Sequence, residues 1–188
     1  MSLGVILYGP PASGKSTIGR LLAEQVEPCR LFRRIKVGGI AKPEYRAMTP
    51  DQLEDLERAG DIVWSNDRYG ATYAIDRPEL MAELGNGVPV LALGQVAAVW
   101  AVAQSVPSAR WLTVELWCPR DEAKRRLLAR DPQDVERRLA VWDATEHLPQ
   151  SDLVIDTRTT ALAEVVELIR TRLIAGAGNA KLRTSSGS

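Results

Sequence analysis

Residues 9–17 combine glycines, a lysine and hydroxyl side chains at a spacing that suits phosphate binding. They read GPPASGKST and match the pattern GxxxxGK[ST] at every required position. Gly9 and Gly14 let the backbone curl so that its N–H groups point at phosphate oxygens. Lys15 would then reach the β- and γ-phosphates, and the Ser16 hydroxyl would ligate Mg²⁺. The sequence therefore predicts a nucleoside triphosphate site formed by Gly9, Pro10, Pro11, Ala12, Ser13, Gly14, Lys15, Ser16 and Thr17.

The segments on either side of this loop are of the kinds that the motif needs. Residues 3–8 form an apolar run that predicts a buried strand, and apolar residues recur at helical spacing from Ile18 to Val26. A helix that begins at Lys15 would direct the positive end of its dipole at the phosphates. The alternative interpretation is a glycine-rich turn with an incidental lysine.

A second group of residues that could act on phosphate is a set of arginines and lysines in two charged helical segments. Phosphoryl transfer spreads negative charge over the equatorial oxygens, which arginine can stabilise. Arg126 and Arg130 are four residues apart on one helical face. We expect Arg130 and Arg138, together with Lys15, to be the catalytic residues. The alternative is a solvated face on which these side chains pair with neighbouring carboxylates. The basic residues of the two segments are Arg120, Lys124, Arg125, Arg126, Arg130, Arg137 and Arg138.

Strands and helices alternate along most of the chain. Apolar runs predict strands at 3–8, 31–37, 62–66, 69–75, 88–93, 111–117 and 153–155. Helical spacing and capping signals predict helices that start at residues 15, 50, 77, 119, 133 and 160. This order indicates an α/β fold of the P-loop NTPase type, in which a parallel sheet has helices on both faces.

The alternation breaks at two places, which we interpret as additions to one domain spanning residues 1–175. The core would comprise residues 1–29, 77–123 and 147–175, with a small acceptor-binding insertion at about 30–76 and a helical lid at about 124–146. Open α/β sheets bind ligands at the carboxyl ends of their strands, where such an insertion would lie. Residues 176–188 are small and polar, and we expect a flexible tail.

Composition excludes several classes of partner. The 188-residue chain has 24 basic and 24 acidic side chains, and this balance argues against a nucleic-acid-binding surface. We find no targeting segment and no apolar stretch long enough to cross a membrane. Two cysteines predict a reducing cytoplasmic setting rather than a disulfide framework. We expect a monomer or homodimer that acts on a small phosphorylated metabolite.

The order of these features resembles the guanylate kinase-like branch of the P-loop nucleotide kinases, over roughly residues 3–174. The shared features are the phosphate loop, Trp64, the Tyr69-Gly70 pair, the strand at 88–93 and the Arg-Arg-Leu triplets that begin at residues 125 and 137. The resemblance implies an ATP-dependent kinase that uses Mg²⁺. The chain is also similar to the ribose 1,5-bisphosphate phosphokinases, which share Arg34, Tyr69-Gly70 followed by Ile75-Asp76, and Gly94.

The chain departs from guanylate kinases at the positions that contact the acceptor. Asn66 aligns with the glutamate that reads guanine, and Gly94-Gln95 replaces an aspartate. Residues 36–42 lack the arginines that grip the GMP phosphate, although Tyr45 stands at the place of the family's phosphate-binding tyrosine. These departures argue against GMP itself. A nucleoside monophosphate is favoured, a sugar phosphate is the alternative, and the predicted acceptor residues are Arg34, Lys36, Tyr45, Asn66, Tyr69 and Gln95.

The side chains that could serve as a base also bear on the acceptor. An alcohol acceptor needs a base to take its proton, whereas an ionised phosphate is already a nucleophile. No carboxylate follows the strand at 88–93, and Asp61, Asp67 and Asp76 remain as alternatives. This favours transfer onto a phosphate. Two other functions stay open: a guanylate kinase-like scaffold without catalysis, and a nucleotide-gated regulator without a second substrate.

Overall fold

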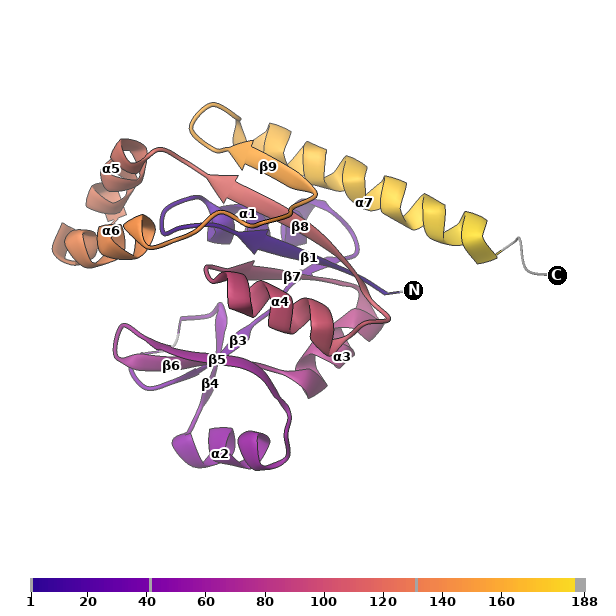
Figure 1. Cartoon of the computed structure of the whole chain (residues 1–188), viewed down its shortest axis with the longest axis horizontal. Coiled ribbons are helices and arrows are strands. Elements are labelled where there is room, and N and C mark those ends of the chain that lie inside the picture. Colours follow the sequence, from indigo (N-terminus) through magenta and orange to yellow (C-terminus); the bar gives the residue numbers. More distant parts are fainter. Residues whose placement is uncertain (1, 41, 131, 185–188) are drawn as a thin grey trace.

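A five-stranded parallel sheet forms the centre of the molecule, in a computed structural model that describes residues 2–40, 42–130 and 132–184 (Figure 1). Its strand order is β2-β7-β1-β8-β9, and every neighbouring pair is parallel. The expected α/β fold with a parallel sheet is confirmed. The strands are β1 (Leu3–Tyr8), β2 (Cys29–Leu31), β7 (Val88–Leu93), β8 (Arg110–Trp117) and β9 (Leu153–Asp156).

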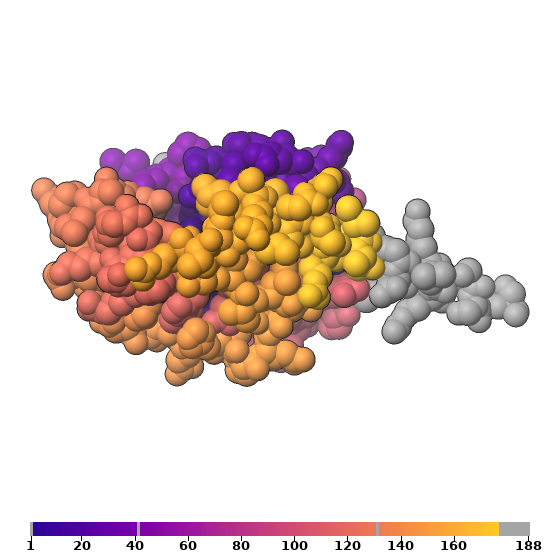
Figure 2. Space-filling view, turned by 90° about the horizontal axis from the view of Figure 1, so that it is seen from above, coloured from indigo at the N-terminus to yellow at the C-terminus, as the bar shows by residue number. Residues whose placement is uncertain are grey.

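Helices cover both faces of this sheet, which explains why its strands are continuous apolar runs. In β1, Val5 and Leu7 face one core, whereas Ile6 and Tyr8 face the other. The first core is closed by α1 (Lys15–Gln25) and α7 (Leu162–Thr184). The second is closed by α3 (Arg77–Asn86) and α4 (Val96–Ser105). Figure 2 shows α7 lying across its face of the molecule, with the lid beyond the amino end of this helix.

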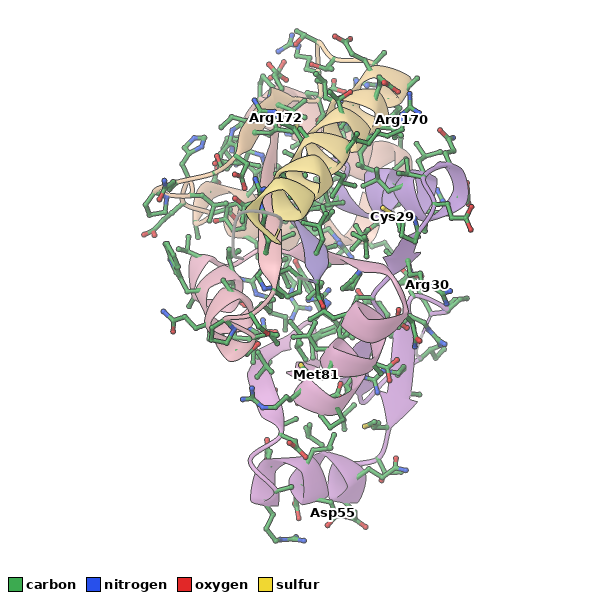
Figure 3. The ribbon with its side chains drawn as sticks, turned by 90° about the vertical axis from the view of Figure 1, so that its right-hand side faces the viewer. Cys29, Arg30, Asp55, Met81, Arg170 and Arg172 are labelled. Carbon is green, nitrogen blue, oxygen red and sulfur yellow. The ribbon has the colours of Figure 1, made fainter. Side chains whose placement is uncertain are left out.

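A second, smaller sheet projects from the first and forms the insertion. Its strand order is β4-β3-β6-β5, and α2 packs on one of its faces through Leu53. Figure 3 shows α2, with Asp55 on its outer side, at the opposite end of the molecule from Arg170 and Arg172 on α7. The elements are β3 (Arg34–Val37), β4 (Tyr45–Met48), α2 (Pro50–Arg58), β5 (Ile62–Arg68) and β6 (Ala71–Asp76).

The prediction of a single strand at residues 31–37 is wrong. The chain forms two short strands that belong to different sheets, β2 in the main sheet and β3 in the small one. Phe32 explains the break, because its side chain is buried in the second core and its N–H still donates to Val90 of β7. Beyond Phe32 the backbone leaves the main sheet and joins the small one.

Two helices form the lid, α5 (Arg120–Arg130) and α6 (Val135–Asp143), joined by a 3-10 turn at Pro132–Asp134. Leu127, Val135 and Leu139 make a small core of their own, against which Ala12 of the phosphate loop packs. The lid therefore sits directly on the loop. Helix α6 begins at Val135 rather than at the expected residue 133, because residues 132–134 form the 3-10 turn.

Helix α7 runs to Thr184, so the tail expected at residues 176–188 is helical as far as that residue. The Arg110 guanidinium, at the start of β8, donates to the Gly176 carbonyl at 3.5 Å and so holds the helix beyond Leu173. Residues 185–188 of the expected tail lie outside the described residues. Within the described part of the chain, every helix is too short or too polar to cross a lipid bilayer.

Candidate active site

The phosphate loop lies between the end of β1 and the start of α1, where backbone shape decides what it can hold. A Cβ on Gly9 would come within 2.0 Å of the Leu116 carbonyl oxygen, so a larger residue does not fit there. Gly14, with φ +97°, and Ala12, with φ +63°, both adopt left-handed backbone conformations. Such geometry costs free energy and recurs at ligand-binding loops, where it aims N–H groups inward.

Lys15 points back over the loop and is held there by oxygens. Its Nζ donates to the carbonyls of Gly9 at 2.7 Å and Pro10 at 2.6 Å, and lies 3.4 Å from Ser13 Oγ. Burial lowers the pKa of Lys15 to about 7, and the charges of Arg34 and Arg68 add to this effect. A bound phosphate would reverse the shift, because an adjacent anion favours the charged ammonium.

A pocket of about 430 Å³ opens beside the loop, between the lid and the start of α7. Its walls combine loop backbone, two arginines and a short apolar stretch, which suits a ligand with a phosphate chain and an apolar ring. The lining residues are Ala12, Gly14, Lys15, Ser16, Thr17, Arg126, Leu127, Arg130, Thr157, Thr160, Ala161 and Leu162.

The face of the insertion sheet that looks away from α2 carries the polar residues. Lys36, Tyr73 and Asn66 are direct neighbours across β3, β6 and β5, so their side chains share one face. Arg34 and Tyr45 form another such pair on that face. The opposite face carries Ile35, Val37 and Ala74 against α2. We call the polar face the acceptor face; its members are Arg34, Lys36, Tyr45, Asn66, Arg68 and Tyr73.

The acceptor face is directed at the phosphate loop. Arg34 and Arg68 lie close enough to Lys15 for their charges to lower its pKa. The Arg34 guanidinium lies 5.6 Å from the centroids of both the Tyr45 and Tyr73 rings, which are themselves 5.3 Å apart. Lys36 donates to the Ile40 carbonyl at 2.6 Å. Two sheets thus bring cations from different parts of the sequence to one place.

Solved structures show what this arrangement resembles. Guanylate kinase from Anaplasma phagocytophilum superposes with a TM-score of 0.62 at 16% identity, over 93% of this chain and 86% of that chain. The protein APE1195 gives a TM-score of 0.56 at 22% identity, over 93% and 96%. No protein-family model and no curated protein matches the sequence. The chain has a guanylate kinase-like fold.

Within this guanylate kinase-like fold, the lid arginines occupy different positions. Arg130 is exposed and lines the pocket. Arg138 pairs with Asp134 at 2.8 Å and lies beside the Tyr69 ring, on the side of the acceptor face. Arg120 and Arg125 pair with carboxylates at the surface, as the solvated-face interpretation expects.

Two of the predicted acceptor residues lie apart from the acceptor face. Gln95 follows β7 at the amino end of α4, next to the phosphate loop, and is half-buried. Tyr69 is at the tip of the β5–β6 hairpin, where its ring contacts the lid. The remaining predicted residues, Arg34, Lys36, Tyr45 and Asn66, are brought together on one surface.

Two of the three carboxylates considered as a base are engaged elsewhere. Asp76 is buried, forms an ion pair with Arg46 and caps α3 through the Glu79 N–H. Asp67 accepts a 2.6 Å hydrogen bond from Thr72 on the α2 side of the small sheet. Both carboxylates make structural contacts in this arrangement.

Arg126 has a role that the sequence does not reveal. Its guanidinium donates to the Ala12 carbonyl at 3.0 Å, to Thr157 Oγ1 at 3.0 Å and to the Thr157 carbonyl at 2.7 Å, and it also pairs with Glu122. It therefore ties the lid, the phosphate loop and the β9–α7 connection together. Periodicity assigns Arg126 to the same helical face as Arg130, but a partner 114 residues away in sequence leaves no local signal.

A buried carboxylate near the lid was also missed. Glu115 on β8 is buried, contacts His147 Nδ1 and accepts from the Leu148 N–H at 3.3 Å. The His147 ring stacks on Trp117 with centroids 3.9 Å apart. These contacts hold the segment that returns from the lid to β9.

The residues present fit a bound Mg²⁺ and nucleotide. Ser16 lies in the first turn of α1 with an exposed side chain, and its hydroxyl is a hard oxygen ligand of the kind that Mg²⁺ takes together with phosphate oxygens and water. Ser16 also lines the pocket beside the loop, together with Lys15 and Thr17. Among the described residues, no group of three or more His, Cys, Asp or Glu side chains forms a metal site.

Proposed function

We propose that the chain is an ATP- and Mg²⁺-dependent phosphotransferase that moves the γ-phosphoryl group to a small phosphorylated acceptor. The observation that carries this proposal is the geometry of Lys15, whose ammonium folds back onto the Gly9 and Pro10 carbonyls at 2.7 and 2.6 Å. Beside it lies the pocket of about 430 Å³ that Arg126 and Arg130 help to line, and basic side chains of this kind suit the phosphates of a donor nucleotide. On the acceptor face, the Arg34 guanidinium lies 5.6 Å from the centroids of the Tyr45 and Tyr73 rings, an arrangement that suits an anionic acceptor.

The residues divide the work of the reaction between them. Lys15 and the loop N–H groups would bind the β- and γ-phosphates, and Arg34 would orient the acceptor phosphate. An oxygen of the acceptor phosphate attacks the γ-phosphorus, and the bond to the β–γ bridging oxygen breaks to release ADP. Arg130 and Arg138 would stabilise the charge that spreads over the transferred group. Bound Mg²⁺ supplies further neutralisation of phosphate charge.

The acceptor face suits a nucleoside monophosphate first and a sugar phosphate second. The Tyr45 and Tyr73 rings offer surfaces for stacking, and Asn66 offers an amide that can both donate and accept hydrogen bonds. Arg34 and Lys36 provide charge for a phosphate group. An amide in place of a carboxylate argues against guanine, whose N1–H and N2–H groups are both donors.

The test is ADP release in a coupled assay with a panel of acceptors. The panel contains the nucleoside monophosphates, ribose 1,5-bisphosphate, other sugar phosphates and unphosphorylated alcohols, with Lys15→Ala as the background control. We expect ADP formation with one phosphorylated compound and none above background with the alcohols. Mg·ATP binding without acceptor-dependent ADP release would contradict the proposal and favour a non-catalytic module.

A further inference from the structure

The tip of the insertion hairpin contacts the lid through one aromatic ring. Tyr69 and Gly70 form the two-residue turn between β5 and β6, and both have positive φ, +54° and +73°. The Arg137 Cζ lies 4.8 Å from the centroid of the Tyr69 ring, and the Arg138 Cζ lies 5.1 Å from it. One ring on the insertion therefore contacts two guanidiniums on α6.

This contact joins two units that have separate cores. The insertion packs around Ile35 and Leu53, whereas the lid packs around Leu127 and Leu139. Two adjacent guanidiniums repel each other, and the negative face of an aromatic ring offsets that repulsion. Arg137 is exposed and lies over the Tyr69 ring, while Arg138 is also held by Asp134.

Tyrosine is an unusual residue for the left-handed backbone conformation at position 69. A two-residue turn with positive φ at both central positions favours Asn-Gly, whereas tyrosine adopts left-handed geometry at a cost. Gly70 already satisfies the second position. A strained residue kept at a turn points to a use for its side chain.

We propose that Tyr69 is a positioning residue that latches the lid to the insertion and holds Arg138 over the reacting phosphates. This inference rests on the proposed function, because it assigns Arg138 to phosphoryl transfer. This positioning role differs from a role in binding the acceptor, which would use the Tyr69 hydroxyl. The contact with the lid depends on the aromatic ring instead.

Two substitutions distinguish the contribution of the Tyr69 ring from those of its backbone conformation and its hydroxyl. Tyr69→Asn removes the ring and leaves an Asn-Gly turn, so the hairpin should fold at least as well as before. Tyr69→Phe removes the hydroxyl and keeps the ring. Hydrogen exchange of the α6 amides, residues 135–143, reports whether the lid is held, and it needs no catalysis.

We expect Tyr69→Asn to speed exchange in α6 by roughly threefold or more, while Tyr69→Phe keeps the wild-type rate. With the acceptor found by the panel, Tyr69→Asn should lower kcat by roughly tenfold and change the ATP KM by less than about twofold, the pattern of an interaction made in the transition state. Tyr69→Phe, which keeps the ring, should retain most of the wild-type kcat.

Three outcomes would overturn the latch. The first is a wild-type rate of exchange in α6 of Tyr69→Asn, and the second is an unchanged kcat in that variant. The third is a Tyr69→Phe variant as impaired as Tyr69→Asn, which would indicate that the hydroxyl binds the acceptor instead. If the wild-type protein releases no ADP with any compound, the proposed function fails. The exchange comparison then decides by itself whether the latch exists.

Discussion

At the scale of single residues, the environment of Lys15 is the feature with the clearest chemical consequence. An ammonium that is buried near Arg34 and Arg68 loses its proton more easily, and the pKa of Lys15 falls to about 7. Binding a polyphosphate places negative charge beside it and raises that pKa again. Nucleotide binding should therefore be coupled to protonation.

We predict that Mg·ATP affinity falls as pH rises from 7.5 to 9. Below pH 7 the free protein already holds the proton on Lys15, whereas above pH 7 binding must take up a proton, and affinity drops by up to roughly tenfold per pH unit. Calorimetry at pH 8 in two buffers of different ionisation enthalpy measures this uptake directly. The control is Lys124→Met, which removes an exposed lysine of α5 and should behave as wild type. Binding with no proton uptake at pH 8 would contradict the account of Lys15.

At the scale of elements, local signals found most helices and strands because those signals are strong. The apolar runs at 3–8 and 88–93 match β1 and β7, and the Thr49–Gln52 capping box starts α2 as expected. The failure at residues 31–37 comes from a tertiary contact. Phe32 is buried in the second core, and it divides one apolar run between two sheets.

The arginines of α5 show the same limit. Arg126 and Arg130 have the same spacing pattern and both line the pocket, but Arg126 is also bonded to Ala12 and Thr157. No property of the sequence near residue 126 indicates those partners. The phosphate-binding role of residues 9–17 stays a prediction, and the sequence could suggest it because the spacing of these residues is itself the signal.

We predict that Arg126→Ala and Arg130→Ala affect different properties, the first stability and the second catalysis. Arg126→Ala leaves several polar groups without a partner and should lower the free energy of unfolding by about 2 kcal/mol, which corresponds to roughly 4–8 °C in Tm for a chain of this size. Arg130→Ala should leave Tm within about 1 °C, because exposed side chains contribute little to stability, and should lower kcat instead. Thermal unfolding and ADP release measure the two effects. Equal Tm losses in both variants would be inconsistent with the distinction.

At the scale of the whole molecule, the main sheet brings the phosphate loop, the insertion and the lid to one edge. The loop lies at the end of β1, the insertion leaves after β2 and returns before α3, and the lid follows β8 (Figure 1). The order of these parts was predictable from the sequence. Four members of the acceptor face, Arg34, Lys36, Tyr45 and Asn66, were named as acceptor residues from the sequence. That they share one face of the small sheet was not predictable, because it depends on strand register.

Arg34 provides a test of this arrangement. Its charge helps to lower the pKa of Lys15, so we predict that Arg34→Met raises that pKa and moves the pH dependence of Mg·ATP binding upward. The same variant should raise the acceptor KM. Arg58→Met removes a charge of equal sign from the exposed α2 of the same insertion and should leave the pH dependence unchanged. Identical pH profiles for Arg34→Met and the wild type would mean that the insertion does not act on the loop.

The central claim is that the backbone cradle around Gly9 and the ammonium of Lys15 bind a nucleoside triphosphate. Titration calorimetry of the purified protein with Mg·ATP and Mg·GTP, beside Lys15→Ala, tests it most directly. We predict saturable binding of at least one nucleotide by the wild type, and loss of that binding in a folded Lys15→Ala variant. Absence of binding to both nucleotides, or equal affinity in Lys15→Ala, would contradict the account.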